Sequence, residues 1–250
     1  MKVLISIRSF EELLPAIEGG ANIIDLKNPT EGSLGASFPW LIKKIRKHSK
    51  DFTLSVAIGD MPNLPGTASL AAHGAATCGA NIIKVGLLGP KSFEDGIKLL
   101  KNVVKAVKNV DQDILVVGAG YADFKLFKGI NSMDIPAICH SAGADVAMLD
   151  TFTKDGRKLF DFIDLEKLRK FVNKTHKNNL IAALAGSLGL EDMKKIHDLG
   201  SDIIGFRGAV CSESDRKNGI IEINRVKKIV KFSRNLNEIG GRTLRSTPIV

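Results

Sequence analysis

The chain has 250 residues, of which 44% are hydrophobic and 25% charged, and these ordinary globular values exclude collagen-like, coiled-coil and disordered classes. Its net charge of +9 favours anionic partners such as nucleic acids, acidic lipids or phosphorylated metabolites. No apolar stretch approaches the roughly 20 residues of a membrane span, and the three cysteines fit neither a disulfide framework nor a zinc site, so we expect a cytoplasmic protein that binds no membrane.

Eight short apolar runs alternate with segments of helical period along the chain. The runs cover residues 3–7, 23–26, 53–58, 82–85, 114–117, 146–149, 180–184 and 203–206. Ser9, Ser92 and Asp164 precede helical segments and are residue types that cap helix N-termini. Because parallel strands need crossover helices, this alternation predicts an α/β protein with a parallel sheet.

A weak internal repeat indicates how the strands are arranged. The segment GANII that starts at Gly20 recurs in related form from Gly79, Gly143 and Gly200, about 60 residues apart each time. Each copy ends a helix at its glycine and opens an even-numbered strand of the series. A fourfold repeat of two βα units is the signature of a closed (β/α)8 TIM barrel. We expect one such domain over residues 1–250, with a short C-terminal tail from about residue 236.

The repeat also predicts which side chains point into the barrel. Side chains alternate along a strand, so residues at equal offsets from each glycine face the same way. The two layers nearest the mouth contain Asp25, Lys84, Met148 and Gly205, and Lys27, Gly86, Asp150 and Arg207. Such layers are normally filled with Val, Ile and Leu. Burying this many ionisable groups is costly unless they are paired or used in chemistry.

Lys27 and Lys84 are the main catalytic candidates. Burial and a second nearby ammonium lower the pKa of a lysine and free its amine to attack a carbonyl. Asp25 and Asp150 can shuttle protons, or hold one lysine charged while the other is neutral. Lys154, four residues beyond Asp150, is a further candidate for contact with the substrate. The alternative is a set of structural ion pairs.

Two glycine-containing turns predict a phosphate site. The turns after the seventh and eighth strands contain Gly186, Ser187, Arg207, Gly208 and Ala209. Barrels that bind phosphorylated substrates commonly use backbone N–H groups of those two loops. Glycine lets the backbone approach the anion, and Arg207 or Arg216 would complete the charge. The alternative is that the glycines only shape turns.

Other residues point to chemistry less strongly. The loops at the expected mouth also contain Asp123, Lys125, Thr151 and Asp155. We expect His73 and His140 on helices, and Cys211 lacks the partners of a nucleophile. The histidines show no metal-binding spacing and there is no nucleotide-binding glycine motif, so neither a metal nor a cofactor is expected. One Trp and one Tyr offer little surface for stacking bases, which favours a small phosphorylated partner over nucleic acid and leaves a homo-oligomer open.

Four segments resemble a known family. They are DLKNP from Asp25, KVGL from Lys84, MLDT from Met148 and FRGAVC from Phe206. In these segments the chain resembles the (5-formylfuran-3-yl)methyl phosphate synthases of methanofuran biosynthesis. The family is also named 4-(hydroxymethyl)-2-furancarboxaldehyde-phosphate synthase. The resemblance extends from Met1 to about Arg234.

The resemblance implies a class I aldolase-like barrel that acts as a carbon–oxygen lyase on phosphates. Two glyceraldehyde 3-phosphates would be condensed into the furan phosphate, with loss of one phosphate and two waters. By resemblance, Lys27 is the Schiff-base lysine and Lys84 the proton-transfer lysine, while Asp25, Asp150 and Lys154 support them.

Two alternatives remain open from the residues themselves. One is another Schiff-base aldolase that acts on sugar phosphates, of the deoxyribose-phosphate or transaldolase type; an isomerase without imine chemistry fits less well. The other is a basic, non-catalytic domain that binds phosphoproteins or nucleic acid. A borohydride trap with triose phosphate separates the two classes, because only an imine is reduced to a stable adduct.

Overall fold

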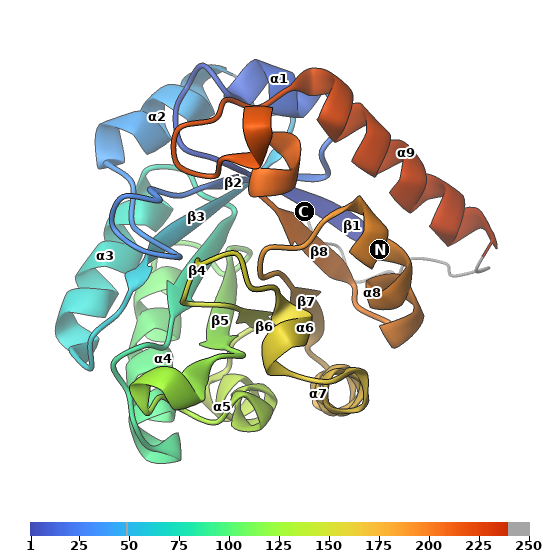
Figure 1. Ribbon diagram of the computed structural model, residues 1–250. Helices are drawn as coiled ribbons and strands as arrows, with labels where there is room; N and C mark the ends of the chain where they lie inside the picture. Colours follow the sequence, from blue (N-terminus) through green and yellow to red (C-terminus); the bar gives the residue numbers. More distant parts are fainter. Residues whose placement is uncertain (49, 240–250) are drawn as a thin grey trace.

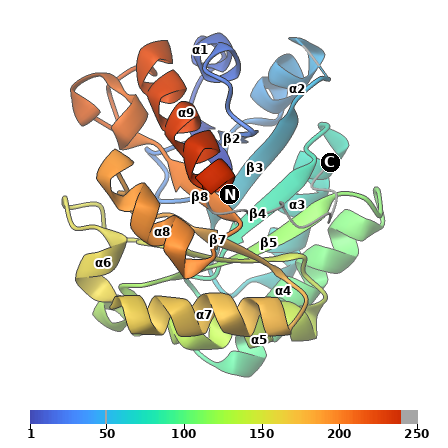
Figure 2. The same cartoon turned by 90° about the vertical axis from the view of Figure 1, so that its right-hand side faces the viewer.

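The strands form a closed ring. The computed structural model describes residues 1–48 and 50–239, in which eight parallel strands pair in sequence order and the last pairs with the first. The strands lie at the centre of Figure 1 with the helices around them, and Figure 2 shows the same arrangement from the side. The predicted (β/α)8 barrel is therefore confirmed.

The strands and helices alternate as expected. The strands are β1 (Lys2–Ile7), β2 (Ile23–Leu26), β3 (Thr53–Asp60), β4 (Ile82–Gly86), β5 (Leu115–Tyr121), β6 (Val146–Asp150), β7 (Ile181–Leu184) and β8 (Ile203–Phe206). The α-helices are α1 (Leu13–Glu18), α2 (Pro39–His48), α3 (Pro65–Thr77), α4 (Phe93–Lys108), α5 (Ile135–Ala142), α6 (Leu159–Phe162), α7 (Leu165–Lys177), α8 (Met193–Leu199) and α9 (Ile223–Ile239). Each predicted run overlaps one strand.

Two strands extend beyond the predicted runs. β3 continues to Asp60 and β5 to Tyr121, through glycines that lower β propensity in the sequence. In β5 the glycines make room for helices, because a Cβ at Gly118 would lie 2.6 Å from Cys139 Sγ and one at Gly120 2.3 Å from a side-chain carbon of α5. Close helix packing thus explains a strand that propensity alone does not predict.

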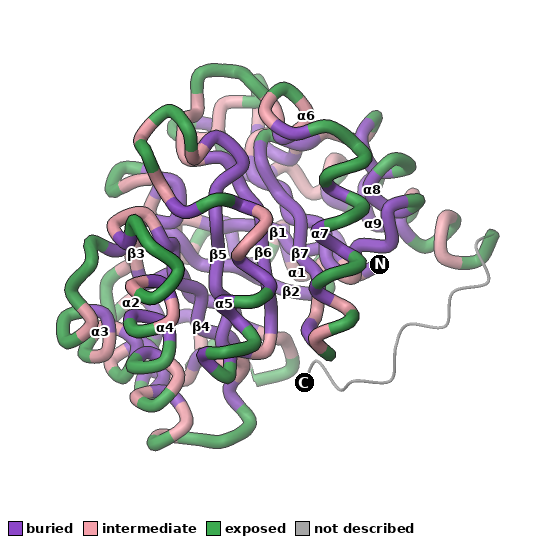
Figure 3. Tube along the Cα trace, turned by 90° about the horizontal axis from the view of Figure 1, so that it is seen from below, coloured by how far each residue is buried: buried purple, intermediate pink, exposed green. Residues whose placement is uncertain are grey.

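The register brings polar residues of three strands to one level. Asp25 in β2 pairs with Ser6 in β1 and with Ser55 in β3. On β4, Lys84 pairs with Ala57 of β3, and the β3–β4 register then shifts between Ala57 and Asp60. Below this level the interior is filled with apolar side chains. In Figure 3 the strands and the helix faces turned toward them are buried.

Two of the three predicted helix N-caps are confirmed. Ser92 caps α4 by accepting a hydrogen bond from the Asp95 amide at 3.1 Å, and Asp164 caps α7 by accepting one from the Lys167 amide at 2.8 Å. The prediction for Ser9 is wrong, because α1 begins at Leu13 and has no side-chain cap.

At the C-terminal end, α9 continues through Ile239. Residues 236–239 of the expected tail are therefore helical, and residues 240–250 lie outside the described part. None of the described helices combines the length and apolarity that crossing a bilayer requires.

The caps can be tested by substitution. Ser92→Ala and Asp164→Ala should each lower the free energy of unfolding by about 1 kcal/mol, because each leaves a helix N–H without its acceptor. Ser9→Ala is the control and should change it by less than about 0.5 kcal/mol. Urea unfolding followed by circular dichroism measures all three. An equal loss for Ser9→Ala would contradict the assigned start of α1.

Candidate active site

A cavity of about 760 Å³ opens at the carboxyl ends of the strands. Active sites of TIM barrels lie at this end, and the volume is that of a small-molecule site. The charged side chains that line it include Lys27, Lys84, Asp150, Lys154, Arg207 and Arg216. The predominance of basic groups favours an anionic ligand.

Asp25 and Lys84 form a buried ion pair at the base of this cavity. Lys84 Nζ donates to both carboxylate oxygens of Asp25, at 2.8 and 2.7 Å. The hydroxyls of Ser6 and Ser55 each donate to the same carboxylate at 2.8 Å. All four residues are buried. The shared register level of β1, β2 and β3 makes this arrangement possible.

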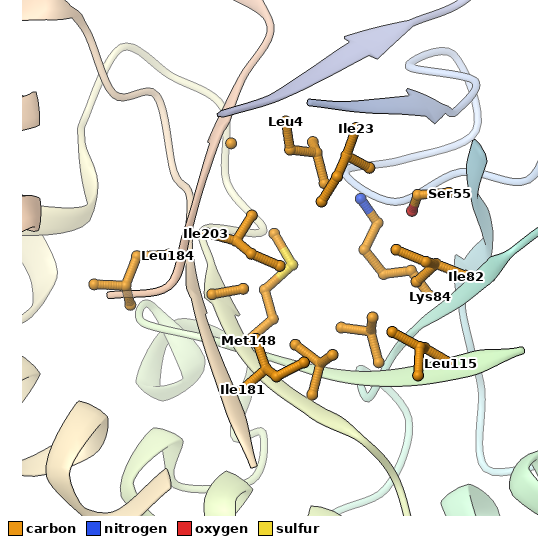
Figure 4. Close-up of a pocket in the computed structure, with 14 residues that line it drawn as sticks. Leu4, Ile23, Ser55, Ile82, Lys84, Leu115, Met148, Ile181, Leu184 and Ile203 are labelled. Atoms are coloured by element: carbon orange, nitrogen blue, oxygen red, sulfur yellow. The ribbon is translucent and has the colours of Figure 1, made fainter. Parts of the chain in front are cut away.

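The surroundings of Asp25 favour its carboxylate form. Burial acts to raise the pKa of Asp25, but the Lys84 ammonium, and after it Lys27, outweigh this effect and hold that pKa below its ordinary value. Figure 4 shows Lys84 and Ser55 in the barrel interior beside a cavity of about 20 Å³, whose lining is mostly aliphatic. In such surroundings, removing one partner would leave an uncompensated buried charge.

Lys27 has no such partner. It follows the end of β2, two residues beyond Asp25, and is 6% exposed. Its Nζ forms no hydrogen bond or ion pair with any residue that the structure describes. Burial lowers the pKa of Lys27 to about 7, because the Asp150 carboxylate opposes this effect only in part and the Lys84 ammonium adds to it. A large fraction of Lys27 is therefore a neutral amine near neutral pH.

Asp150, the last residue of β6, and Lys154, in the loop that follows, form a second pair. Lys154 Nζ donates to Asp150 Oδ1 at 2.7 Å and to Thr151 Oγ1 at 3.0 Å. Burial acts to raise the pKa of Asp150, but the ammonium groups of Lys154 and Lys27 outweigh it and lower the pKa. The site thus contains two lysines, Lys84 and Lys154, that form ion pairs with aspartates, and a third, Lys27, that forms none.

The two predicted phosphate turns border the same cavity. Gly186, Ser187, Gly208 and Ala209 all line it. Their backbone N–H groups donate to no described residue, so they are free for an anion. Gly186 has a φ of +118° and Ser187 one of +53°, a left-handed geometry that turns the backbone sharply after β7.

Arg207 does not have the role that its position predicts. A guanidinium has five N–H donors, and those of Arg207 form five hydrogen bonds: to both oxygens of Glu12 and to three backbone carbonyls. The Nη1–Oε2 distance to Glu12 is 2.6 Å and both residues are buried. The expectation that Arg207 binds phosphate is corrected, because no donor is left.

Several polar residues at the mouth have no counterpart in the sequence pattern. The Tyr121 hydroxyl donates a short hydrogen bond to Asp60, which also accepts from the Leu34 amide at 3.2 Å. Burial is the largest cause that raises the pKa of both Asp60 and Tyr121. The sequence does not reveal Asp60 and Tyr121, because glycines end the predicted runs before β3 reaches Asp60 and β5 reaches Tyr121. Glu12 lacked any signal, since its partner Arg207 is far away in the sequence.

Three further polar residues predicted at the mouth do not line the cavity: Asp123, Lys125 and Asp155. The buried Asp123 accepts from the amides of Phe152 and Thr153 at 2.8 and 2.7 Å and so fixes the loop after β6. Lys125 is exposed, and the exposed Asp155 pairs with Arg157.

The remaining side chains that the sequence singled out are structural. His73 and His140 lie on α3 and α5, as predicted. Burial raises the pKa of Cys211 to about 11, which suits a structural thiol.

Solved structures share the barrel. A crystal structure of 3-hexulose-6-phosphate synthase superposes with a TM-score of 0.62, at 18% identity, over 92% of this chain and 99% of that one. At this level of identity the likeness concerns the fold alone.

Sequence relatives are much closer. Proteins named (5-formylfuran-3-yl)methyl phosphate synthase are 50% identical in Methanococcus maripaludis, over 94% of this chain and 100% of the relative, and 49% identical in Methanothermobacter thermautotrophicus, over 92% and 97%. The family model described as 4-HFC-P synthase matches residues 3–230. The chain therefore belongs to the 4-HFC-P synthase family.

Proposed function

We propose that the protein is a carbon–oxygen lyase that condenses two glyceraldehyde 3-phosphates into (5-formylfuran-3-yl)methyl phosphate through a Schiff base on Lys27, in methanofuran biosynthesis. The observation that carries this proposal is the difference between the buried lysines. Asp25 binds the Lys84 ammonium with both oxygens, whereas Lys27 has no partner and its pKa is lowered to about 7 by burial. The name of the relatives supports the product.

Imine formation is the first covalent step. The neutral Lys27 amine attacks the substrate aldehyde, a C–N bond forms, and the carbonyl oxygen takes up a proton. The carbinolamine then loses its C–O bond as water. We assign to Lys154, whose Nζ lies 2.7 Å from Asp150 Oδ1, the donation of the proton to the leaving hydroxyl. Its own proton is replaced from solvent at the open mouth.

Carbon–carbon bond formation needs an enamine. Loss of a proton from the carbon next to the iminium gives this nucleophile, which attacks the aldehyde of the second triose phosphate. Lys84 lines both the mouth cavity and the interior cavity, and we assign it the proton transfers of the aldol, dehydration and phosphate-loss steps. To take up the proton from that carbon, the Lys84 ammonium first gives one of its own protons to the Asp25 carboxylate that it contacts, and Asp25 gives the proton back at the end of the cycle.

Phosphate recognition falls to the backbone of the two turns. Four residues line one cavity and have backbone N–H groups without a described partner: Gly186, Ser187, Gly208 and Ala209. We assign to these N–H groups the binding of the phosphate oxygens of one substrate. This assignment retains four of the five residues that the sequence predicts for the phosphate and omits Arg207. A small phosphorylated substrate also suits the net charge of +9.

The Schiff base can be trapped chemically. Borohydride added with glyceraldehyde 3-phosphate should inactivate the protein and leave an adduct on Lys27, located by peptide mass spectrometry. Lys27→Arg should abolish the adduct, because a guanidinium remains protonated and forms no imine. Lys84→Arg is the matched control and should retain some adduct at Lys27. An adduct on Lys84 would exchange the two roles, and no adduct in active enzyme would contradict the mechanism.

The lowered pKa of Lys27 predicts that the rate of trapping depends on pH. Its pKa of about 7 lies below the ordinary 10.5, so the neutral form is lost as pH falls through 7. Trapping of unphosphorylated glyceraldehyde by cyanoborohydride should slow about tenfold per pH unit below 7 and level off above it.

Variants of two aspartates sharpen this test. Asp150→Asn removes a carboxylate that raises the pKa of Lys27, so the midpoint of trapping should move to lower pH. Asp155→Asn, at an exposed aspartate, should leave the midpoint unchanged. A midpoint that rises in Asp150→Asn would show that the carboxylate does not act on Lys27.

A further inference from the structure

The Arg216 side chain forms no ion pair or hydrogen bond with any residue that the structure describes. It lies between β8 and α9 and lines the mouth cavity. Its Nη2 atom is shielded from solvent and has no hydrogen-bond partner. The guanidinium interacts electrostatically with Asp150 and Asp60, on β6 and β3, so its field reaches across the mouth. A desolvated donor without an acceptor is costly in a folded protein, and a bound anion would remove that cost.

The loop that presents Arg216 is held firmly. Arg207 donates to the Arg216 carbonyl at 3.1 Å and to the Gly219 carbonyl at 3.3 Å. Arg8 donates to the Asn218 carbonyl at 3.0 Å. These contacts fix the backbone from Arg216 to Gly219.

Glu12 is the common partner of the two arginines that hold this loop. Its carboxylate accepts hydrogen bonds from Arg207 Nη1 at 2.6 Å and from Arg207 Nη2 at 2.9 Å. Arg8 Nε lies 3.6 Å from Glu12 Oε1. Glu12 is only 3% exposed, so its carboxylate is an internal anchor. Through Arg207 it fixes the backbone from which the Arg216 side chain extends.

The Cβ of Arg216 lies close to Gly208, in the turn after β8. A Cβ at Gly208 would be 3.9 Å from Arg216 Cβ and 3.1 Å from the carbonyl oxygen of Ser214 in the same loop. The loop therefore packs directly against Gly208. Backbone donors supply hydrogen bonds but no net charge, and an adjacent guanidinium supplies both.

We propose that Arg216, held in place by the Glu12–Arg207 pair, is the cation of the substrate phosphate site. Arg207 is a positioning residue and does not touch the phosphate. The identity of the substrate rests on the proposed function, whereas binding of a phosphate dianion between Arg216 and the turn at Gly208 does not.

Calorimetric titration with inorganic phosphate tests the site directly. The wild-type protein should bind phosphate saturably, and Arg216→Ala should bind it about ten- to a hundredfold more weakly, the effect of losing a charge-assisted hydrogen bond. Arg216→Lys should recover part of the loss, because it restores the charge but not the planar fork. Arg225→Ala, which changes a surface pair with Glu222, should bind like wild type. Equal affinity in Arg216→Ala, or no saturable binding by wild type, would overturn the proposal.

A double variant tests the positioning role of Glu12. Glu12→Gln should weaken phosphate binding and raise the KM for glyceraldehyde 3-phosphate more than it lowers kcat. If Glu12 acts through Arg216, Glu12→Gln combined with Arg216→Ala should bind phosphate no more weakly than Arg216→Ala alone. Fully additive losses would contradict the positioning role. Folding of each variant is checked by its urea midpoint.

The two proposals fail in different ways. Arg216→Ala should still form the Lys27 adduct with unphosphorylated glyceraldehyde, while losing its preference for the phosphorylated substrate. A wild-type protein that binds phosphate through Arg216 but gives no adduct would contradict the Schiff-base function and support the anion site. If Arg216→Ala forms the adduct and still prefers the phosphorylated substrate as strongly as wild type, the result would support the Schiff-base function and contradict the anion site.

Discussion

The buried ion pair between Asp25 and Lys84 is the interaction on which the rest of the site depends. It places one ammonium inside the barrel and satisfies it with both oxygens of a carboxylate that also accepts from Ser6 and Ser55. A second ammonium close by is then disfavoured by repulsion as well as by burial. Lys27 is the residue that experiences both effects. The chemical difference between the lysines thus follows from which of them has a carboxylate in contact.

The arginines at the mouth are divided in the same way. Arg207 uses its five donors within the protein, where it joins Glu12 to the loop between β8 and α9. Arg216, carried by that loop, keeps a donor that no described residue satisfies. In both the lysine and the arginine pairs, one cation is satisfied within the fold and a second remains available for an incoming molecule. The pairing stabilises the barrel and also prepares the site.

Much of the fold and the centre of the site could be predicted because strand geometry is regular. Side chains alternate strictly along a strand, so equal offsets from the repeated glycines place Asp25 and Lys84 in one layer, where the structure brings them into contact. The same rule sends Lys27 and Asp150 to the mouth cavity. The repeat has this value because the barrel closes in sequence order, which makes equivalent positions neighbours around one axis.

The failures come from contacts that no local pattern records. Arg207 was expected to bind phosphate, but its partner Glu12 lies 195 residues away and reaches it only when β8 closes against β1. Asp60 and Tyr121 were missed because glycines hide the ends of β3 and β5. The most direct test of the central claim is a titration of Lys27 by nitrogen NMR in 15N-lysine-labelled protein, with Lys27→Arg to assign the signal. Our account predicts a midpoint near pH 7, whereas a Lys27 ammonium that persists to its ordinary value of 10.5 would contradict it.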